Sequence, residues 1–326
     1  MQRLTTRLTE FLGIEHPILS APMALAAGGA LAASVTRAGG LGLIGGGYGD
    51  AAWLDQQFAA AGNTRIGCGF ITWSMARTPS LLTQALSHKP KALMLSFGDP
   101  RPHAGEIAAA GATLICQCQT IAHVRDALDA GAQIVVAQGS EAGGHGQSRG
   151  TLNFVAEVAD LLARVSPATL LVAAGGIGDG RGLAAALMLG ADGVLMGTRL
   201  WATRQALVQD SHRAAILASD GDGTARTRAP DIARHLDWPA PFTVRVANNA
   251  FVRRWEGKED QLRAVADSEG DKYRAAFAAG DAENAGVFFG EVAGLVSDIP
   301  DAGDVVVRTV AQAIETMARR QALVAP

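Results

Sequence analysis

The sequence is poor in cysteine, in aromatic residues and in charge. Its 326 residues include three cysteines, 5% aromatic residues and 18% charged residues. Cys68, Cys116 and Cys118 lack the spacing and the neighbouring histidines of a zinc site, so we expect reduced structural thiols and no metal. With 28 basic and 31 acidic residues and a net charge of −3, the chain lacks the electrostatic basis for binding nucleic acid or an anionic membrane.

Long hydrophobic runs are also missing. No apolar stretch approaches the ~18 residues of a membrane span, and residues 1–17 carry arginines and threonines where a signal peptide has an apolar segment. We therefore expect a soluble, cytoplasmic protein. Apolar residues nevertheless make up 48% of the chain, which excludes disorder and supplies a core.

Short apolar runs alternate with alanine-rich stretches of helical spacing. This alternation is typical of βα units around a parallel sheet. The length exceeds that of one ordinary domain, but it suits a single (β/α)₈ TIM barrel, and eight such runs predict that fold. The predicted strands are 17–20, 41–45, 65–70, 92–97, 113–118, 133–138, 169–174 and 193–197.

The pattern changes after about residue 205, where charges increase and strand-like runs nearly disappear. We therefore assign residues 1–205 and 285–326 to the barrel, and residues 206–284 to a small, mainly helical insertion on the substrate side. Apolar spacing over 305–319 predicts the last helix of the barrel. Earlier helices are expected to end at left-handed glycine caps, namely Gly39, Gly111, Gly131 and Gly190.

Two glycine-rich loops follow the seventh and eighth predicted strands. They are Ala174–Gly180 and Met196–Arg199. In barrels the reactive groups lie at the carboxyl ends of the strands, and these two loops commonly hold a phosphate through backbone N–H groups and helix amino termini. The loops therefore predict a site for a phosphate-bearing cofactor, with simple tight turns as the alternative. The glycines do not match the dinucleotide pattern G-x-G-x-x-G.

The sixth loop carries a histidine among glycines. His145 is flanked by Gly143, Gly144 and Gly146, so its sequence neighbours give it little cover. We expect it to face a ligand, as a general base or as a hydrogen-bond partner of an anion, with a solvent-exposed loop histidine as the alternative. The other histidines are expected at surface or cap positions, namely His16, His88, His103, His123, His212 and His235.

These motifs together resemble one family. The run Gln138-Gly-Ser-Glu-Ala-Gly-Gly-His145, with Ala21-Pro22-Met23 and the two glycine loops, resembles the nitronate monooxygenases, formerly called 2-nitropropane dioxygenases. The likeness covers most of the chain and is weakest over 206–284. It implies an FMN enzyme in which His145 is the active-site histidine. The residues that it assigns to the cofactor are Ala21, Pro22, Met23, Gly69, Thr72, Gln117, Gln138, Gly143, Gly144, Gly175, Gly176, Met196, Gly197 and Thr198.

The resemblance also assigns these residues different tasks. The flavin phosphate is expected at Gly175, Gly176, Gly197 and Thr198, and the isoalloxazine against Ala21-Pro22-Met23. Gly143 and Gly144 would allow its close approach. Hydrogen bonds to the flavin are expected from Gln138, from the backbone at Gly69 and from the Thr72 hydroxyl.

Three positions depart from the family pattern. Some relatives carry lysine at the position of Gln117 and asparagine near Gly69, so this chain lacks a cation and an amide beside the flavin's polar edge. Gly146 stands where proline is frequent, and we therefore expect a more mobile loop after His145.

The function implied is oxidation of alkyl nitronates, and also of neutral nitroalkanes, by FMN and O₂ to a carbonyl compound and nitrite. One alternative is an NAD(P)H-dependent flavin reductase of quinones or enoyl-ACP, although Arg226, Arg228, Arg253 and Arg254 are too scattered to define a nicotinamide site. The other is a non-catalytic protein that binds a phosphate ligand. In that case His145 would be inert, and tryptophans such as Trp238 would form a partner surface.

Overall fold

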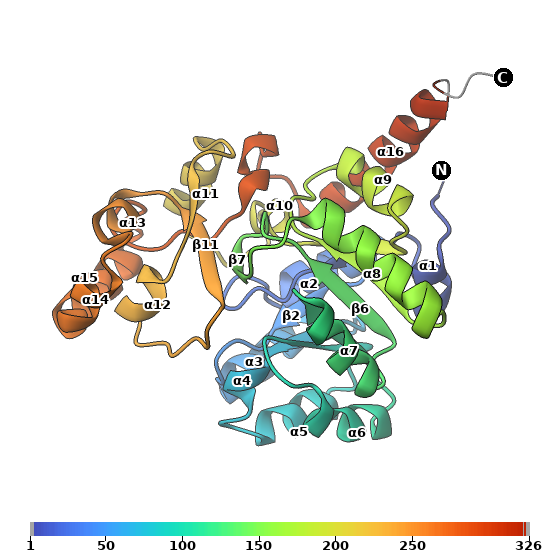
Figure 1. Ribbon diagram of the computed structural model, residues 1–326, viewed down its shortest axis with the longest axis horizontal. Helices are drawn as coiled ribbons and strands as arrows, with labels where there is room; N and C mark the ends of the chain where they lie inside the picture. The colour runs from blue at the N-terminus through green and yellow to red at the C-terminus, as the bar shows by residue number, and fades with distance from the viewer. Residues whose placement is uncertain (1–2, 322, 324–326) are drawn as a thin grey trace.

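Eight parallel strands form the centre of the protein, for which we analysed a computed structural model (Figure 1). The structure describes residues 3–321 and 323. Hydrogen-bonded neighbours follow the order β1-β9-β8-β6-β5-β4-β3-β2. A parallel bridge between Leu19 and Leu41, with the Ser20 N–H donating to the Leu41 carbonyl at 3.0 Å, joins the two edges. The predicted TIM barrel is thereby confirmed.

Each predicted apolar run contains or overlaps one barrel strand. Both faces of these strands are buried, which is why they appear as continuous apolar runs in the sequence. In β6, Ile134 and Val136 point into the barrel, whereas Val135 and Ala137 pack against the surrounding helices. The strands are β1 (Ile18–Ser20), β2 (Leu43–Gly45), β3 (Gly67–Ile71), β4 (Ala92–Ser96), β5 (Thr113–Cys118), β6 (Ile134–Gln138), β8 (Leu170–Ala174) and β9 (Gly193–Met196).

Helices surround the sheet, and the last one packs against α9 and α2. The four glycines expected after helices have φ of 92°, 69°, 74° and 94° at Gly39, Gly111, Gly131 and Gly190, so they adopt the left-handed conformation. The barrel helices are α1 (Arg7–Leu12), α2 (Gly29–Arg37), α3 (Ala51–Ala61), α4 (Thr72–Met75), α5 (Ser80–Ser87), α6 (Arg101–Ala109), α7 (Ile121–Asp129), α8 (Thr151–Val165), α9 (Gly180–Met188), α10 (Thr198–Trp201) and α16 (Ala302–Gln321).

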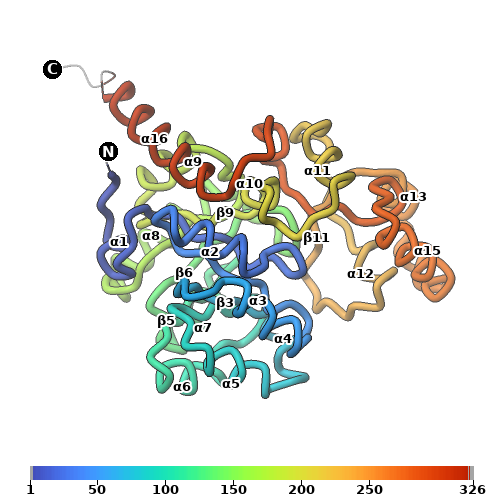
Figure 2. The backbone as a smooth tube through the Cα atoms, turned by 180° about the vertical axis from the view of Figure 1, so that it is seen from behind, coloured from blue at the N-terminus to red at the C-terminus, as the bar shows by residue number. Residues whose placement is uncertain are grey.

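Residues 206–284 lie on the side of the molecule away from both termini (Figures 1 and 2). The segment has a core of its own, which includes Val244, Val246, Phe251 and Tyr273. Its elements are α11 (Asp210–Leu217), β10 (Thr224–Thr227), α12 (Ala229–Ala233), β11 (Thr243–Ala247), α13 (Ala250–Trp255), α14 (Glu259–Ala264) and α15 (Ala266–Ala279), and the 3₁₀ helix η1 (Glu291–Leu295) follows it.

A second sheet connects this insertion to the barrel, and the sequence did not predict it. β11 pairs antiparallel with β10 on one side and with β7 (Gly144–Gly146) on the other, where His145 lies opposite Val244. The residues around His145, expected as a loop, are therefore an edge strand. A side chain at Gly146 would place its Cβ 2.7 Å from Arg226 Nη2, so the glycine leaves room for that guanidinium.

Candidate active site

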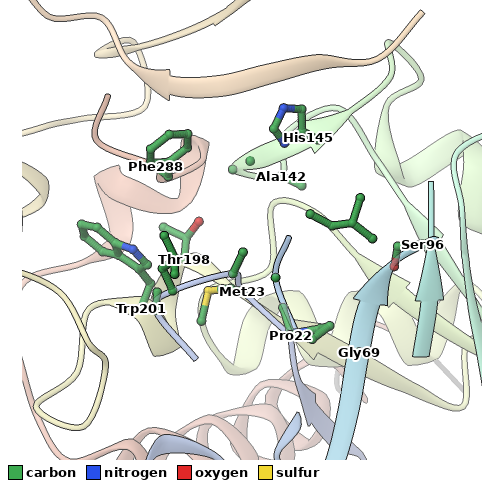
Figure 3. A pocket seen from close by; sticks show the side chains of 18 of the residues that line it. Pro22, Met23, Gly69, Ser96, Ala142, His145, Thr198, Trp201 and Phe288 are labelled. Atoms are coloured by element: carbon green, nitrogen blue, oxygen red, sulfur yellow. The ribbon is translucent and has the colours of Figure 1, made fainter. Parts of the chain in front are cut away.

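A cavity of about 530 Å³ lies at the carboxyl ends of the barrel strands. In Figure 3, His145 and Phe288 point into it from one side, and Pro22, Met23 and Gly69 lie on the other. The insertion supplies part of the wall, including Arg234, Trp238, Tyr273, Arg274 and Phe277. Barrel and insertion therefore build the cavity together.

Most of the residues predicted from the sequence line this cavity. They are Ala21, Pro22, Met23, Gly69, Gln117, Gln138, Gly143, Gly144, His145, Gly175, Gly176, Gly197 and Thr198.

Two predicted residues do not line it. Strand alternation turns the side chain of Met196 outward into the layer between barrel and helices, while its neighbour Leu195 lines the cavity. Thr72 begins α4, and its side chain packs under the loop at Gly98, where an added Cβ would lie 2.8 Å from Thr72 Cβ. Its hydroxyl is buried with no hydrogen-bond partner among the described residues. Thr72 is therefore not among the residues that line the cavity, and the expected hydrogen bond from its hydroxyl to a cofactor stays a prediction.

The two glycine loops present free backbone N–H groups. Within the described chain no acceptor pairs with the N–H groups of Gly176, Gly197 and Thr198. An added Cβ at Gly197 would make only ordinary contacts, 3.6 Å to Ala21 Cβ and 3.8 Å to Met23 Sδ. Protein packing therefore does not explain this glycine, and the arrangement fits an anionic group held by backbone donors.

The amino terminus of α9, by contrast, is already capped. The Asp179 carboxylate accepts from the N–H groups of Arg181 at 2.9 Å and Gly182 at 3.3 Å. The Gln312 side chain accepts from the Gly180 N–H at 2.8 Å. The first N–H groups of α9 are therefore already paired, whereas those of Gly176, Gly197 and Thr198 have no acceptor among the described residues.

Three glutamines form a hydrogen-bonded cluster on the floor of the cavity. Gln138 Oε1 accepts from Gln117 Nε2 at 3.2 Å and from Gln119 Nε2 at 2.8 Å, and Gln138 Nε2 donates to the His145 carbonyl at 3.1 Å. The cluster leaves Gln117 Oε1 and one N–H of Gln138 for a ligand. Gln119, which completes it, was not predicted from the sequence.

His145 is covered by side chains from the insertion. Its Nε2 lies 3.0 and 2.9 Å from the two carboxylate oxygens of Asp231, and its ring stacks on Trp238 with centroids 3.4 Å apart and planes at 7°. The side chains of His145 and Asp231 are 9% and 4% exposed, which excludes a solvated loop histidine. Burial lowers the pKa of His145, with Asp231 acting in the opposite direction. The imidazole is therefore neutral at pH 7.

Other cavity residues come from positions that the sequence did not single out. His212, expected at the surface, is buried and lines the cavity beside Phe277, with ring centroids 5.7 Å apart. Arg234 lies 5.5 Å over the Tyr48 ring and 5.6 Å over the Phe288 ring, and no carboxylate of the described residues is within ion-pair distance of it. Its guanidinium is thus a positive group available to a ligand.

The described residues contain no group of three or more histidine, cysteine or acidic side chains that could hold a metal. None of the helices in the described chain combines the length and the apolar character needed to cross a membrane.

Comparison with known proteins decides the family. The model of the nitronate monooxygenase family matches residues 5–64 and 74–312. The chain belongs to the nitronate monooxygenase family. The resemblance noted in the sequence is confirmed, and membership of this family makes the protein an oxidoreductase.

Relatives of the family match nearly the whole chain. The nitronate monooxygenase of Neurospora crassa is 31% identical, over 94% of this chain and 92% of the relative. The structure of FabK from Thermotoga maritima superposes with a TM-score of 0.86 at 29% identity, covering 98% of this chain and 100% of the other. Nitroalkane oxidase from Streptomyces ansochromogenes gives a TM-score of 0.79 at 25% identity, covering 94% and 99%.

The nitronate monooxygenase family model leaves out residues 65–73. This segment contains β3 and the start of α4, and with them Gly69 and Thr72. An added Cβ at Gly69 would lie 2.4 Å from Pro22 Cγ, so the strand passes close to Pro22 here. The segment between the two matched ranges is therefore part of the cavity wall.

Proposed function

We propose that the protein oxidises alkyl nitronates with O₂ to a carbonyl compound and nitrite, using FMN. The observation that carries this proposal is that one cavity of a nitronate monooxygenase family member joins free loop N–H groups with a buried, neutral His145. When bound, FMN supplies the electron transfer between substrate and O₂.

The cofactor end of the cavity fits FMN in charge and in hydrogen-bonding groups. The N–H groups of Gly176, Gly197 and Thr198 would hold the phosphate, since the described chain gives them no other acceptor. Gln117 and Gln138 would bond the polar edge of the isoalloxazine with neutral amides. Because Gln117 is a neutral amide, the polar edge faces no cation from this position.

The substrate end suits a small anion with an alkyl chain. The unpaired guanidinium of Arg234 attracts a nitronate, and the rings of Phe97, Trp238 and Phe288 supply apolar walls that exclude water. Glu141 lies at the other end, beside Gly176, where an added Cβ would be 3.3 Å from the Glu141 Cβ. Its carboxylate accepts from the Thr151 N–H at 3.0 Å and hydroxyl at 2.8 Å, which holds it in place.

A second candidate, an NAD(P)H-dependent flavin reductase, is favoured by the similarity to FabK over the whole chain. The four arginines that the sequence suggested for a 2′-phosphate do not support it. Arg226 donates to the Ser140 and Thr243 carbonyls, Arg228 to the Trp238 carbonyl, and Arg253 to the Asn248 carbonyl. Arg254 pairs with Glu269. These guanidiniums are engaged separately and do not converge on one pocket.

The non-catalytic alternative has less support. It required Trp238 to form an exposed partner surface, but Trp238 is 5% exposed and stacks on His145.

Anaerobic mixing of the FMN-loaded protein with propyl nitronate, and separately with NADH and NADPH, tests the proposal. We expect the visible absorption of the flavin to bleach with propyl nitronate alone. Rapid bleaching by a nicotinamide, with no response to the nitronate, would move the assignment to the reductase. A protein that cannot be loaded with FMN would contradict both activities.

A further inference from the structure

A buried carboxylate from the insertion faces one nitrogen of His145. Asp231 lies on α12, and both of its carboxylate oxygens are within hydrogen-bond distance of Nε2. His145 is the sole side chain of the described residues that hydrogen-bonds to this carboxylate. An ionised carboxylate can only accept hydrogen bonds, so Nε2 must carry a proton. In the neutral ring, the lone pair is then on Nδ1.

Nδ1 faces a different environment. It makes no hydrogen bond within the described chain, and it is not among the fully buried polar atoms that lack a partner. The His145 side chain lines the cavity. The free lone pair is therefore accessible to a molecule bound there.

Two aromatic neighbours fix the plane of the ring but allow two orientations within that plane. Trp238 fixes the plane by stacking at 3.4 Å, and Phe97 meets the ring edge-on with centroids 6.3 Å apart. A half-turn of the imidazole would preserve the stacking but would present a C–H group to Asp231. The carboxylate therefore decides between the two orientations that the aromatic rings allow.

We propose that Asp231 is a positioning residue that directs Nδ1 of His145 at the α-proton of a neutral nitroalkane. This deepens the proposed function by including that substrate. The proton moves from the α-carbon to Nδ1, and the C–H electron pair stays on the substrate, which becomes the nitronate. Asp231 remains ionised and balances the imidazolium, as a carboxylate does in other base–carboxylate pairs.

The surrounding charges determine the dependence on pH. Asp231 favours the protonated ring, whereas burial and the guanidiniums of Arg234 and of Arg226 on β10 oppose it. The rate with a nitroalkane should rise with pH through the pKa of His145, which lies below the ordinary value of 6.5. Removing the carboxylate should move this rise to still lower pH and reduce the plateau.

The test compares Asp231→Asn with the FMN-loaded wild type on nitroethane and on pre-formed ethyl nitronate. We expect kcat/KM for nitroethane to fall about 10²- to 10⁴-fold, with the nitronate still oxidised and FMN still bound. The matched control is Asp55→Asn, which breaks the surface pair of Asp55 with His88, 2.7 Å apart, and should leave both activities unchanged. Equal losses on both substrates, or undiminished turnover of nitroethane, would overturn the proposal.

A second measurement does not depend on turnover. Nitrogen NMR of protein labelled in its histidines should report the Nε2–H tautomer for His145 in the wild type. An Nδ1–H tautomer would refute the positioning role even if Asp231→Asn did not fold. If the wild type oxidised neither substrate, the proposed function would fail, but the tautomer would still decide whether Asp231 orients the ring.

Discussion

Gly69, Gly143 and Gly197 all line the cavity, but an added side chain would meet different atoms at each. At Gly69 its Cβ would lie 2.4 Å from Pro22 Cγ, and at Gly143 it would lie 2.5 Å from the Phe289 carbonyl carbon and the Gly290 nitrogen. At Gly197 it would touch Ala21 and Met23 at ordinary van der Waals distances. Contacts within the protein therefore explain why Gly69 and Gly143 have no side chain. They do not explain Gly197, whose lack of a side chain we attribute to a bound ligand.

Gly197→Ala should separate cofactor binding from stability. Because the protein can accommodate the methyl group, we expect the melting temperature of the FMN-free form to stay unchanged. FMN affinity should fall at least tenfold, about 1.4 kcal/mol, as measured by fluorescence titration. Gly105→Ala, at an exposed helical position where a Cβ meets nothing within 4 Å, is the matched control. Unaltered FMN affinity in Gly197→Ala would place the phosphate elsewhere.

At the scale of elements, the cavity depends on contacts between segments far apart in the chain. β7 pairs with β11, and the β6–β7 loop packs on residues 289–290, where the Gly290 N–H donates to Thr198 Oγ1 at 2.9 Å. The glycine loop after β9, the His145 strand and the segment before η1 are thereby held together.

Gly143→Ala should break this junction. The methyl group would meet backbone atoms of residues 289–290, which cannot move aside as a side chain can, so we expect a loss of about 1–3 kcal/mol in the free energy of unfolding. Urea denaturation measures it, with Gly105→Ala again as the reference. A variant with the free energy of unfolding of the wild type would show that the backbone at residues 289–290 can move to accept the methyl group.

The barrel strands could be predicted from the sequence because both of their faces are buried. β7 and β10 could not, since Gly-His-Gly and Thr-Ala-Arg-Thr lack apolar residues that mark a strand. A signal for β11 was present: Thr243–Ala247 alternates, with Val244 and Val246 buried in the core of the insertion.

Only part of the candidate site could be predicted from the sequence. His145 stands out through its glycine neighbours, but its partner Asp231 is 86 residues away along the chain, and only the tertiary fold brings them together. The same holds for Trp238, which was assigned to a partner surface in the sequence-based alternative. Local pattern thus identifies the barrel half of the cavity and leaves the insertion half undetermined.

At the scale of the whole molecule, several histidines are partly or largely buried in their neutral form. Burial is the main cause that lowers the pKa values of His103, His123, His145 and His212 below the ordinary 6.5. The unfolded chain therefore binds more protons than the folded one as the pH falls below about 6.5. Their stabilising effect is present above that pH and is lost below it.

We expect the melting temperature to be lower at pH 5 than at pH 7.5. Carboxylates with lowered pKa values, such as Asp99 and Asp179, contribute mainly near and below the ordinary 3.8, outside this window. Differential scanning calorimetry at constant ionic strength measures the difference, and His212→Gln should make it smaller. Identical melting temperatures at the two pH values would contradict the assignment of these histidines as buried and neutral.

The second sheet also limits the lengths that the chain can have near the cavity. His145 stacks on Trp238 and lies opposite Val244 in the ladder, so residues 239–243 must connect two residues that are both placed against the same histidine. With one of them deleted, the chain could keep the stacking of Trp238 on His145 only if β11 shifted by one position along β7. Such a shift would turn Val244 and Val246 out of the core. Among relatives, insertions and deletions should therefore be rare between these two contacts, even where the residues themselves vary freely.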